Sequence, residues 1–421
     1  MMAAAPGLSF GDPYVLALVF GGVAVLAAVG ALSHEEDRAF SASVIYLGLG
    51  AAAAAAIGLL DLRWVDPLDD ARLFERVTEL AVVIALFATG LRLDRPLRAA
   101  EWRTVARLLL VAMPLTIAAV ALFGTQVMGL SLGAAIILGA VLAPTDPVLA
   151  GDIGVGPPND EEEREPNFAV TGEAGLNDGL AYPFVLLGIL VAGDRGPGWL
   201  ASWALEDVAY KILVGVAVGA LVGYGLAAVV VRLRDRRLLR TELDGWLAVG
   251  AVPILYGLAE ALSGYGFLAA FAGGLAFRRY ESGHEYNDGV HRGAETVEKF
   301  AELAVVLLIG SSVTLAGLGE PGVAGWLLAP LLLLVVRPAS VALAVVRSGL
   351  GRGERAFLGW FGVRGIGSVY YLAVVAGSGA LARDELSRVV WTTLVVVLAS
   401  LLIHGVTAAP LSRRWNHPSG R

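Results

Sequence analysis

Long apolar stretches, each bounded by charged or turn-forming residues, follow one another along almost the whole chain. Their typical length of about 20 residues is what a helix needs to cross the ~30 Å hydrocarbon core of a bilayer. The pattern therefore predicts an all-α polytopic membrane protein with about 13 transmembrane helices. The predicted spans are residues 12–32, 42–60, 73–91, 104–124, 128–150, 167–192, 208–231, 243–261, 264–280, 296–318, 322–346, 355–377 and 388–411.

The composition excludes a soluble protein and several kinds of partner. Hydrophobic residues make up 57% of the 421 residues and charged residues 16%, and the mean hydropathy is +0.71, which is more apolar than one soluble core accommodates. The chain has no cysteine and five scattered histidines, so we expect no disulfide, no thiolate metal site and no cofactor. A net charge of −7 argues against a nucleic-acid partner. No basic segment precedes the first apolar stretch, so we expect no cleaved signal peptide.

Arginines are distributed unevenly between the connections on the two sides of a thirteen-span arrangement. Twenty lie on one set of alternate connections and six on the other. Because basic residues are enriched in cytoplasmic loops, this asymmetry predicts an N-terminus outside and a C-terminus in the cytoplasm of a cell (inner) membrane. We expect residues 1–421 to form a single membrane domain without a soluble C-terminal domain.

Two of the apolar stretches contain sequences that a continuous helix does not tolerate. The fifth carries Pro-Thr-Asp-Pro at residues 144–147, and the twelfth carries Gly-Val-Arg-Gly at residues 362–365. If the seventh stretch is a linker, the chain divides into two inverted six-helix repeats in which these segments correspond. Such pairs predict discontinuous helices that cross at a substrate site near the bilayer midplane. Asp146 and Arg364 would neutralise the helix dipoles at that crossing.

The sixth stretch carries Glu173, Asn177 and Asp178 at a depth where ionisable groups are costly and mark functional sites. Asp178 has no basic residue within reach on its own helix, and desolvation disfavours its charged form. Such a carboxylate can hold either a proton or a monovalent cation, while Asn177 supplies a neutral amide. One exchangeable carboxylate implies one cation per proton and no net charge movement.

Glu173 needs a positive partner, because an unpaired buried carboxylate is strongly destabilising. The candidates are Arg337, which precedes Pro338 in the eleventh stretch, and Arg364. We favour Arg337, because an arginine always stays charged and forms two parallel hydrogen bonds with a carboxylate. The pair would then be a structural clamp. The alternative is that Glu173 is itself the transport carboxylate.

Taken together, these segments resemble the sodium/proton exchanger-type branch of the monovalent cation:proton antiporters, over essentially the whole chain. The residues that carry the resemblance are Thr145-Asp146-Pro147, Gly172-Glu173, Asn177-Asp178, Arg337-Pro338 and Gly362-Val363-Arg364-Gly365. The resemblance implies a secondary transporter, not an enzyme, that exchanges Na⁺ for H⁺ by alternating access as a homodimer in membrane lipid.

The resemblance also implies a division of the chain and of the site. Residues 104–192 and 322–411 would form the moving core, and residues 12–91 and 208–318 the dimerisation scaffold and linker. Asp178 would carry the cation and the proton, Thr145 and Asp146 would shape the site, and Glu173 would pair with Arg337.

Two positions depart from the family pattern. Ala174 stands where relatives commonly have an ion-ligating serine, and Ala88 stands where many members have a carboxylate in the third span. Glu79, nine residues earlier and about 13 Å along the helix, is a candidate accessory group, with Arg364 as its suggested partner. Because oxygens are missing, Li⁺ and K⁺ stay open beside Na⁺, and K⁺/H⁺ exchange is the alternative function.

The remaining polar groups in apolar stretches receive simpler interpretations. Lys299 is expected to pair locally with Glu298 and Glu302, and Lys211 to lie at a rim. His404 is either a hydrogen-bonded packing residue or a pH sensor, and Glu260 has no assigned role. The acidic run at residues 160–165 is read as a solvated loop.

Two other function classes were weighed against a transporter. An intramembrane aspartyl protease would use Asp146 and Asp178 as a dyad that shares a proton, but it leaves Glu173, Asn177 and the paired broken helices without a role. A cation channel would need a repeated carbonyl filter or a ring of carboxylates, and the sequence contains neither pattern.

Overall fold

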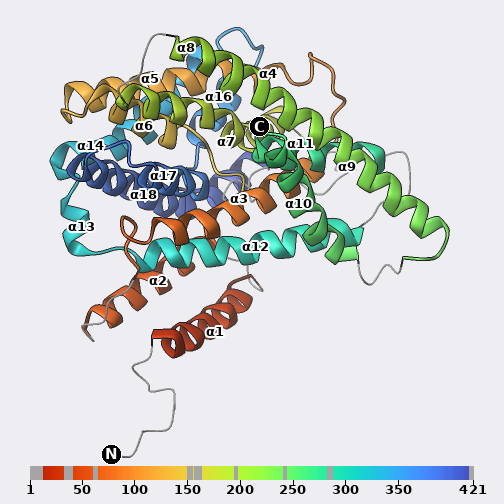
Figure 1. Cartoon of the computed structure of the whole chain (residues 1–421), viewed down its shortest axis with the longest axis horizontal. Helices are drawn as coiled ribbons and strands as arrows, with labels where there is room; N and C mark the ends of the chain where they lie inside the picture. The colour runs from red at the N-terminus through yellow and green to blue at the C-terminus, as the bar shows by residue number, and fades with distance from the viewer. Residues whose placement is uncertain are drawn as a thin grey trace, which may run out of the picture.

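The structure, a computed structural model, describes residues 13–32, 41–59, 65–148, 155, 164–193, 198–239, 244–281 and 288–416. Within these residues every regular element is a helix (Figure 1), which confirms the all-α fold class. Most of the predicted acidic run, residues 160–163, lies outside the described residues.

The helices follow the predicted apolar stretches closely. In the first half of the chain they are α1 (Pro13–Leu32), α2 (Ala42–Leu59), α3 (Ala71–Arg92), α4 (Arg103–Arg107), α5 (Met113–Gln126), α6 (Leu132–Leu142), α7 (Glu165–Ala192), α8 (Trp199–Ser202) and α9 (Lys211–Asp235). In the second half they are α10 (Asp244–Ala261), α11 (Gly266–Glu281), α12 (Asp288–Ser311), α13 (Leu315–Gly319), α14 (Gly322–Leu331), α15 (Arg337–Ala344), α16 (Arg352–Trp360), α17 (Ile366–Ser378) and α18 (Arg383–Asn416).

Six helical segments in the described part of the chain are long and apolar enough to cross a membrane: Ala42–Leu59, Arg103–Gln126, Glu165–Ala192, Trp199–Asp235, Gly322–Ala344 and Arg383–Ala408. Shorter apolar helices add Leu18–Gly30, Leu132–Leu142, Gly245–Ala261 and Ile366–Ser378. The protein is therefore a multi-pass membrane protein by helix length and composition. The total of thirteen spans and the inverted repeats stay predictions.

The predicted interruptions of the fifth and twelfth stretches are confirmed. α6 ends at Leu142, and residues 143–148 are not helical, since Pro144 and Pro147 cannot donate helical hydrogen bonds. In the twelfth stretch α16 ends at Trp360 and α17 begins at Ile366, with non-helical backbone between them. Each break leaves a helix end inside the protein.

The helices form two groups that meet along α3, α7 and α17. In one group α11 packs against α9 and α3, and α12 packs against α2, α3 and α10. In the other, α6 packs against α5 and α7, α14 against α18, and α15 against α16. α17 contacts helices of both groups, including α3 and α6. Figure 1 shows α1 at one edge of the molecule, where it contacts α2.

Glycines at every fourth position allow α9 and α11 to approach backbone to backbone. A Cβ atom at Gly215, Gly219 or Gly223 would collide with the backbone of residues 265–273. Small residues in this spacing are typical of close helix packing in membranes. The contact fixes Tyr265 and the start of α11 against α9.

Wide π-helical turns join α-helical parts in three places of the described chain, residues 203–210 between α8 and α9 and two shorter segments that each precede a proline. Residues 108–112 connect α4 to α5 before Pro114, and residues 332–336 connect α14 to α15 before Pro338. A wider turn accommodates a proline, which lacks the amide hydrogen that an α-helix uses. The second of these turns ends directly before Arg337 and so sets its position.

Candidate functional site

The two broken segments cross, and Asp146 connects them. The Asp146 amide donates to the Val363 carbonyl at 2.8 Å. Its carboxylate accepts the amide hydrogen of Ile366, the first residue of α17, and the amide hydrogen of Val148 at 2.9 Å. Asp146 is 2% exposed. It therefore places a negative charge at the N-terminus of α17, where the helix dipole favours one.

Arg364 makes the reciprocal contact with the other helix end. Its Nε donates to the carbonyl of Leu142, the last residue of α6, at 2.6 Å, and its Nη1 donates to the Gly362 carbonyl. The side chain is fully buried. Arg364 thus brings a positive charge to the C-terminus of α6, where carbonyl groups have no helical partner. Each break supplies the charge that the other helix end requires.

Asp178 lies beside the N-terminus of α17. It is 1% exposed, and within the described residues neither carboxylate oxygen has a hydrogen-bond partner. A Cβ atom at Gly367, in the first turn of α17, would collide with this carboxylate. The glycine thus allows the carboxylate to approach the helix end directly. Of the three buried carboxylates at the crossing, Asp178 alone has no donor among the described residues.

Asn177 and Thr145 form a neutral contact between α7 and the first break. The Asn177 Nδ2 group donates to the Thr145 hydroxyl at 2.7 Å, and both residues are buried. The Asn177 Oδ1 atom is buried without a hydrogen-bond partner in the described part of the chain. Asn177 and Asp178 are neighbours on α7, and the oxygens of both are buried without a partner among the described residues; a carboxylate and neutral oxygens are donor types suited to a hard cation of low charge.

The structure brings Glu173 and Arg337 together. Arg337 donates to both carboxylate oxygens of Glu173, at 2.5 and 2.7 Å, and also to the Leu358 carbonyl at 3.3 Å. Both side chains are about 2% exposed. A Cβ atom at Gly362 would collide with the guanidinium groups of Arg337 and Arg364. Gly362 therefore lets two arginines occupy the space around the second break.

The suggested pairing of Glu79 with Arg364 is wrong. Glu79 accepts hydrogen bonds from the Tyr256 hydroxyl and, at 2.8 Å, from Arg76, whereas Arg364 donates to backbone carbonyls. Glu79 lies near the start of α3, and Ala88, at the position where many relatives have a carboxylate, is on the same helix two turns further along. Its distance from Ala88 explains why it does not substitute there.

Two other sequence-based interpretations change in detail. Lys299 does pair locally, but with Glu295 at 3.3 Å, while Glu298 pairs with Arg92 and Glu302 accepts from Ser43. Lys211 pairs with Asp207 at 2.6 Å, four residues earlier. The predicted local pairing of Lys299 is therefore confirmed, through Glu295, while Glu298 forms an ion pair with Arg92 on α3.

Sequence reasoning missed Ser400 and Ser368 at the breaks, whereas His404 has the hydrogen bonds expected of a packing residue, one of its two predicted roles. Ser400 on α18 accepts the Arg364 amide hydrogen at 2.8 Å, and His404 lies against Ser400 and against the Trp360 carbonyl at 3.0 Å. Ser368, in the first turn of α17, has a buried hydroxyl without a partner among the described residues. No local sequence signal marks Ser400 or Ser368, because Ser400 contacts a residue 36 positions away and the Ser368 hydroxyl makes no hydrogen bond in the described part of the chain.

The described residues contain no group of three or more His, Cys, Asp or Glu side chains that could hold a resident metal ion. A helical membrane protein with two crossing broken helices and an unpartnered buried carboxylate has the architecture of a secondary transporter. The family model described as "sodium/hydrogen exchanger, transmembrane" matches residues 40–414. The chain belongs to the sodium/hydrogen exchanger family.

Curated relatives are antiporters, that is, transporters rather than enzymes. The chain is 26% identical to the Na⁺/H⁺ antiporter NhaH of Halobacillus dabanensis over 425 residues, which covers 96% of this chain and 98% of that protein. It is 24% identical to the K⁺/H⁺ antiporter NhaP of Alkalimonas amylolytica over 338 residues, or 80% of this chain and 57% of that one. It is 25% identical to Na⁺/H⁺ antiporter 2 of Zygosaccharomyces rouxii over 73% of this chain, but spans only 40% of that longer protein.

The fold matches a solved antiporter structure. The sodium proton antiporter MjNhaP1 from Methanocaldococcus jannaschii at pH 8 superposes with a TM-score of 0.71 over 94% of this chain and 99% of that one, at 17% identity. The likeness establishes the fold, including its helical membrane architecture.

Proposed function

We propose that the protein is a secondary antiporter that exchanges one monovalent cation, Na⁺ or Li⁺, for one proton by alternating access. The observation that carries the proposal is the Asp178 carboxylate, which is buried at the crossing without a hydrogen-bond donor among the described residues. Such a group gains most from binding either a proton or a cation, because both remove an uncompensated buried charge. The family and the Na⁺/H⁺ antiporter relatives support the same exchange.

Competition at one carboxylate couples the two ions. When Asp178 holds a cation it cannot hold a proton. Each time the site moves from one side of the membrane to the other, it therefore carries either one cation or one proton. Asn177 on α7 supplies a neutral amide, and Thr145 in the first break supplies a hydroxyl that accepts from it. Asp146 is engaged by two backbone amides and acts on the position of α17. Coupling therefore depends on Asp178 alone.

Alternating access would move one group of helices against the other. We assign residues 104–192 and 322–411 to the moving core, and residues 12–91 and 208–318 to a scaffold that dimerises in the lipid bilayer. The packing supports this assignment, since α5 to α7 and α14 to α18 contact one another, as do α2, α3 and α9 to α12. We place the N-terminus outside and the C-terminus in the cytoplasm, following the arginine asymmetry.

K⁺/H⁺ exchange is the second candidate, and one observation favours it. Ala174 and Ala88 are buried methyl groups at positions from which the resemblance leads one to expect ligand oxygens. Ligand oxygens compensate a cation for the water that it loses on binding, and the free-energy cost of losing this water is greater for Li⁺ and Na⁺ than for K⁺. A site with fewer oxygens therefore favours K⁺. A K⁺/H⁺ antiporter is among the relatives.

A protease dyad does not fit the geometry. A shared proton requires two carboxylates that face each other, but backbone amides occupy both oxygens of Asp146. The relatives are transporters, which agrees with this conclusion.

The function is tested by proton flux in everted membrane vesicles after addition of Na⁺, Li⁺ or K⁺. Wild-type protein should release protons from acidified vesicles on addition of its cation, and Asp178→Asn should abolish the response, because an uncharged amide cannot exchange a bound proton for a cation. Asp384→Asn, which changes an exposed carboxylate at the start of α18, is the matched control and should exchange normally. Exchange by Asp178→Asn at the wild-type rate would contradict the proposal.

A further inference from the structure

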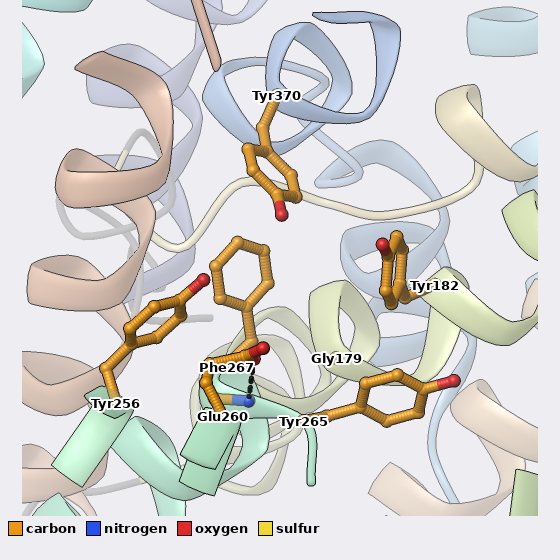
Figure 2. Close-up of a pocket in the computed structure, with 8 residues that line it drawn as sticks. Gly179, Tyr182, Tyr256, Glu260, Tyr265, Phe267 and Tyr370 are labelled. Carbon is orange, nitrogen blue, oxygen red and sulfur yellow. Dashed lines mark hydrogen bonds between the residues drawn. The ribbon is translucent and has the colours of Figure 1, made fainter. Parts of the chain in front are cut away.

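A small cavity lies where α10 ends and α11 begins, beside α7 and α17 (Figure 2). Its walls include Gly179, Tyr182, Tyr256, Glu260, Phe267 and Tyr370. The volume open to the centres of water molecules is about 20 Å³, which is enough for one water molecule or an ion of similar size. In the proposed orientation the cavity lies on the outer side of Asp178.

The cavity contains oxygen atoms that the exchange mechanism does not use. The Glu260 Oε1 atom accepts the Gly266 amide hydrogen at 3.0 Å, and the second carboxylate oxygen has no hydrogen bond within the described residues. Tyr370 is 8% exposed, and its hydroxyl likewise makes no hydrogen bond there. Figure 2 shows this hydroxyl directed into the space between Phe267 and Tyr182. The Glu260 side chain is exposed, and the Tyr370 hydroxyl is not among the fully buried atoms without a partner, so both oxygens are accessible to a ligand that enters the cavity.

One layer of aromatic rings separates the cavity from Asp178. Tyr182 stacks on Tyr371 with ring centroids 5.7 Å apart, and Tyr370 lies 5.1 Å from Tyr371. The Tyr371 hydroxyl donates to the Asp178 carbonyl, and Gly179, the next residue, lines the cavity itself. The cavity is therefore adjacent to the Asp178 segment without being part of the carboxylate site.

The walls come from both helix groups. Gly179, Tyr182 and Tyr370 belong to α7 and α17, whereas Tyr256 and Glu260 belong to α10. Relative movement of the groups would change the distance between the Tyr370 hydroxyl and the Glu260 carboxylate. A ligand held between them would be bound in one arrangement and released in another.

We propose that this cavity is a second binding site for the transported monovalent cation. The cation occupies it before it reaches Asp178 from the outside, or after it leaves Asp178 toward the outside. Glu260 supplies the carboxylate ligand and Tyr370 a neutral oxygen, and the surrounding ring faces attract a cation as well. The site rests on the proposed exchange function. A carboxylate beside neutral oxygens matches the chemistry of a hard cation of low charge.

The test is the cation dependence of exchange measured from each side of proteoliposomes, with Na⁺ and Li⁺ as probes. Glu260→Gln should raise the half-saturating cation concentration on the cavity side by roughly tenfold, because a charged ligand is lost. The value on the opposite side and the maximal rate should stay as in wild type. Since the chain has no cysteine, a single Leu262→Cys label identifies the side on which the cavity opens.

Two further variants sharpen the result. Tyr370→Phe keeps the ring and removes only the hydroxyl, so it should give a smaller shift on the same side even if Glu260→Gln fails to insert. Glu206→Gln, an exposed carboxylate before α9 on the same side of the protein, should change nothing. The inference would be overturned if both cavity variants had the half-saturating cation concentration of wild-type protein. It would also be overturned if this concentration rose equally on both sides of the membrane.

The outcome separates this inference from the exchange function. If wild-type protein exchanges, Asp178→Asn does not, and Glu260→Gln and Tyr370→Phe behave as wild type, only the second site is refuted. If wild-type protein fails to exchange any monovalent cation, the proposed function itself is refuted, and with it the second site.

Discussion

Three buried carboxylates near the crossing have different surroundings, and the surroundings assign their roles. Glu173 forms two hydrogen bonds with Arg337, Asp146 accepts two backbone amides, and Asp178 has no donor in the described part of the chain. A carboxylate that is fully compensated gains little from a proton or a cation. Of the three carboxylates, Asp178 therefore gains the most free energy from binding a proton or a cation.

The Glu173–Arg337 pair should matter for stability more than for cation affinity. Arg337→Leu leaves a buried carboxylate without its partner, which should destabilise the protein by about 3–5 kcal/mol. Thermal unfolding in detergent, followed by tryptophan fluorescence, measures the loss, and the half-saturating cation concentration of the surviving protein should change little.

Two comparison variants make this prediction specific. Arg383→Leu removes an arginine from the exposed ion pair with Asp69 and should leave the unfolding temperature nearly unchanged, because solvent screens such a pair. The double variant Glu173→Leu, Arg337→Leu should recover part of the loss, since it leaves no orphaned charge. A large change in cation affinity with normal stability would instead make Glu173 a transport ligand.

Whether a contact of the site could be predicted from the sequence depends on how far apart its residues lie along the chain. Asp146, Arg364 and Asp178 could be located because prolines, glycines and charges inside apolar stretches violate local rules. Glu79 was misassigned, since Tyr256, its partner on α10, is 177 positions away. The cavity beside Glu260 could not be foreseen, because it exists only where four helices meet.

At the scale of helices, the contacts of the candidate site converge on the N-terminus of α17. Its first residue, Ile366, donates to Asp146, and Gly367 lies against Asp178. The backbone before it is held from α18, where Ser400 accepts from the Arg364 amide and His404 contacts Ser400 and the Trp360 carbonyl. The position of α17 therefore depends on a network that spans the whole break.

Substitutions in that network should slow exchange and should not be additive. Ser400→Ala and His404→Leu each remove part of the link, so each should reduce the exchange rate about fivefold, equivalent to about 1 kcal/mol. The double variant should resemble the stronger single variant, because both residues act through the same contacts. Proton flux in vesicles gives the three rates.

The control for this double-mutant cycle is Thr407→Ala on the same helix. It removes a hydrogen bond to the Trp360 indole, at 3.3 Å, rather than to the Trp360 carbonyl, and should leave the rate nearly unchanged. Strictly additive losses from Ser400→Ala and His404→Leu would show that the two residues do not form one network.

At the scale of the whole molecule, the pattern of breaks suggests how two helix groups share one site. The broken segments exchange charges, Asp146 to α17 and Arg364 to α6, so neither helix end is uncompensated inside the bilayer. The wide turns before Pro114 and Pro338 recur at corresponding places in the predicted halves. The length of the apolar stretches predicted the helices, and the prolines, glycines and charges within two of them predicted where these helices are interrupted.

Because one carboxylate lacks a partner and the other two are compensated, the cycle should move no net charge. An exchanger of one cation for one proton stops when the cation gradient equals the proton gradient, whatever the membrane potential. Each additional charge per cycle would contribute about 2.3 kcal/mol per 100 mV. The dependence of the final cation gradient on the imposed membrane potential therefore measures how many carboxylates exchange protons in each cycle.

The measurement uses proteoliposomes without a pH gradient, in which a permeant anion such as thiocyanate sets the potential, so that K⁺ remains available as a tested substrate. Wild-type protein should bring the cation concentrations on the two sides to equality at every imposed potential. A potential-dependent final gradient would require a second titrating group. Glu173→Gln would then identify whether that group is Glu173, since the final gradient of this variant would return to equality.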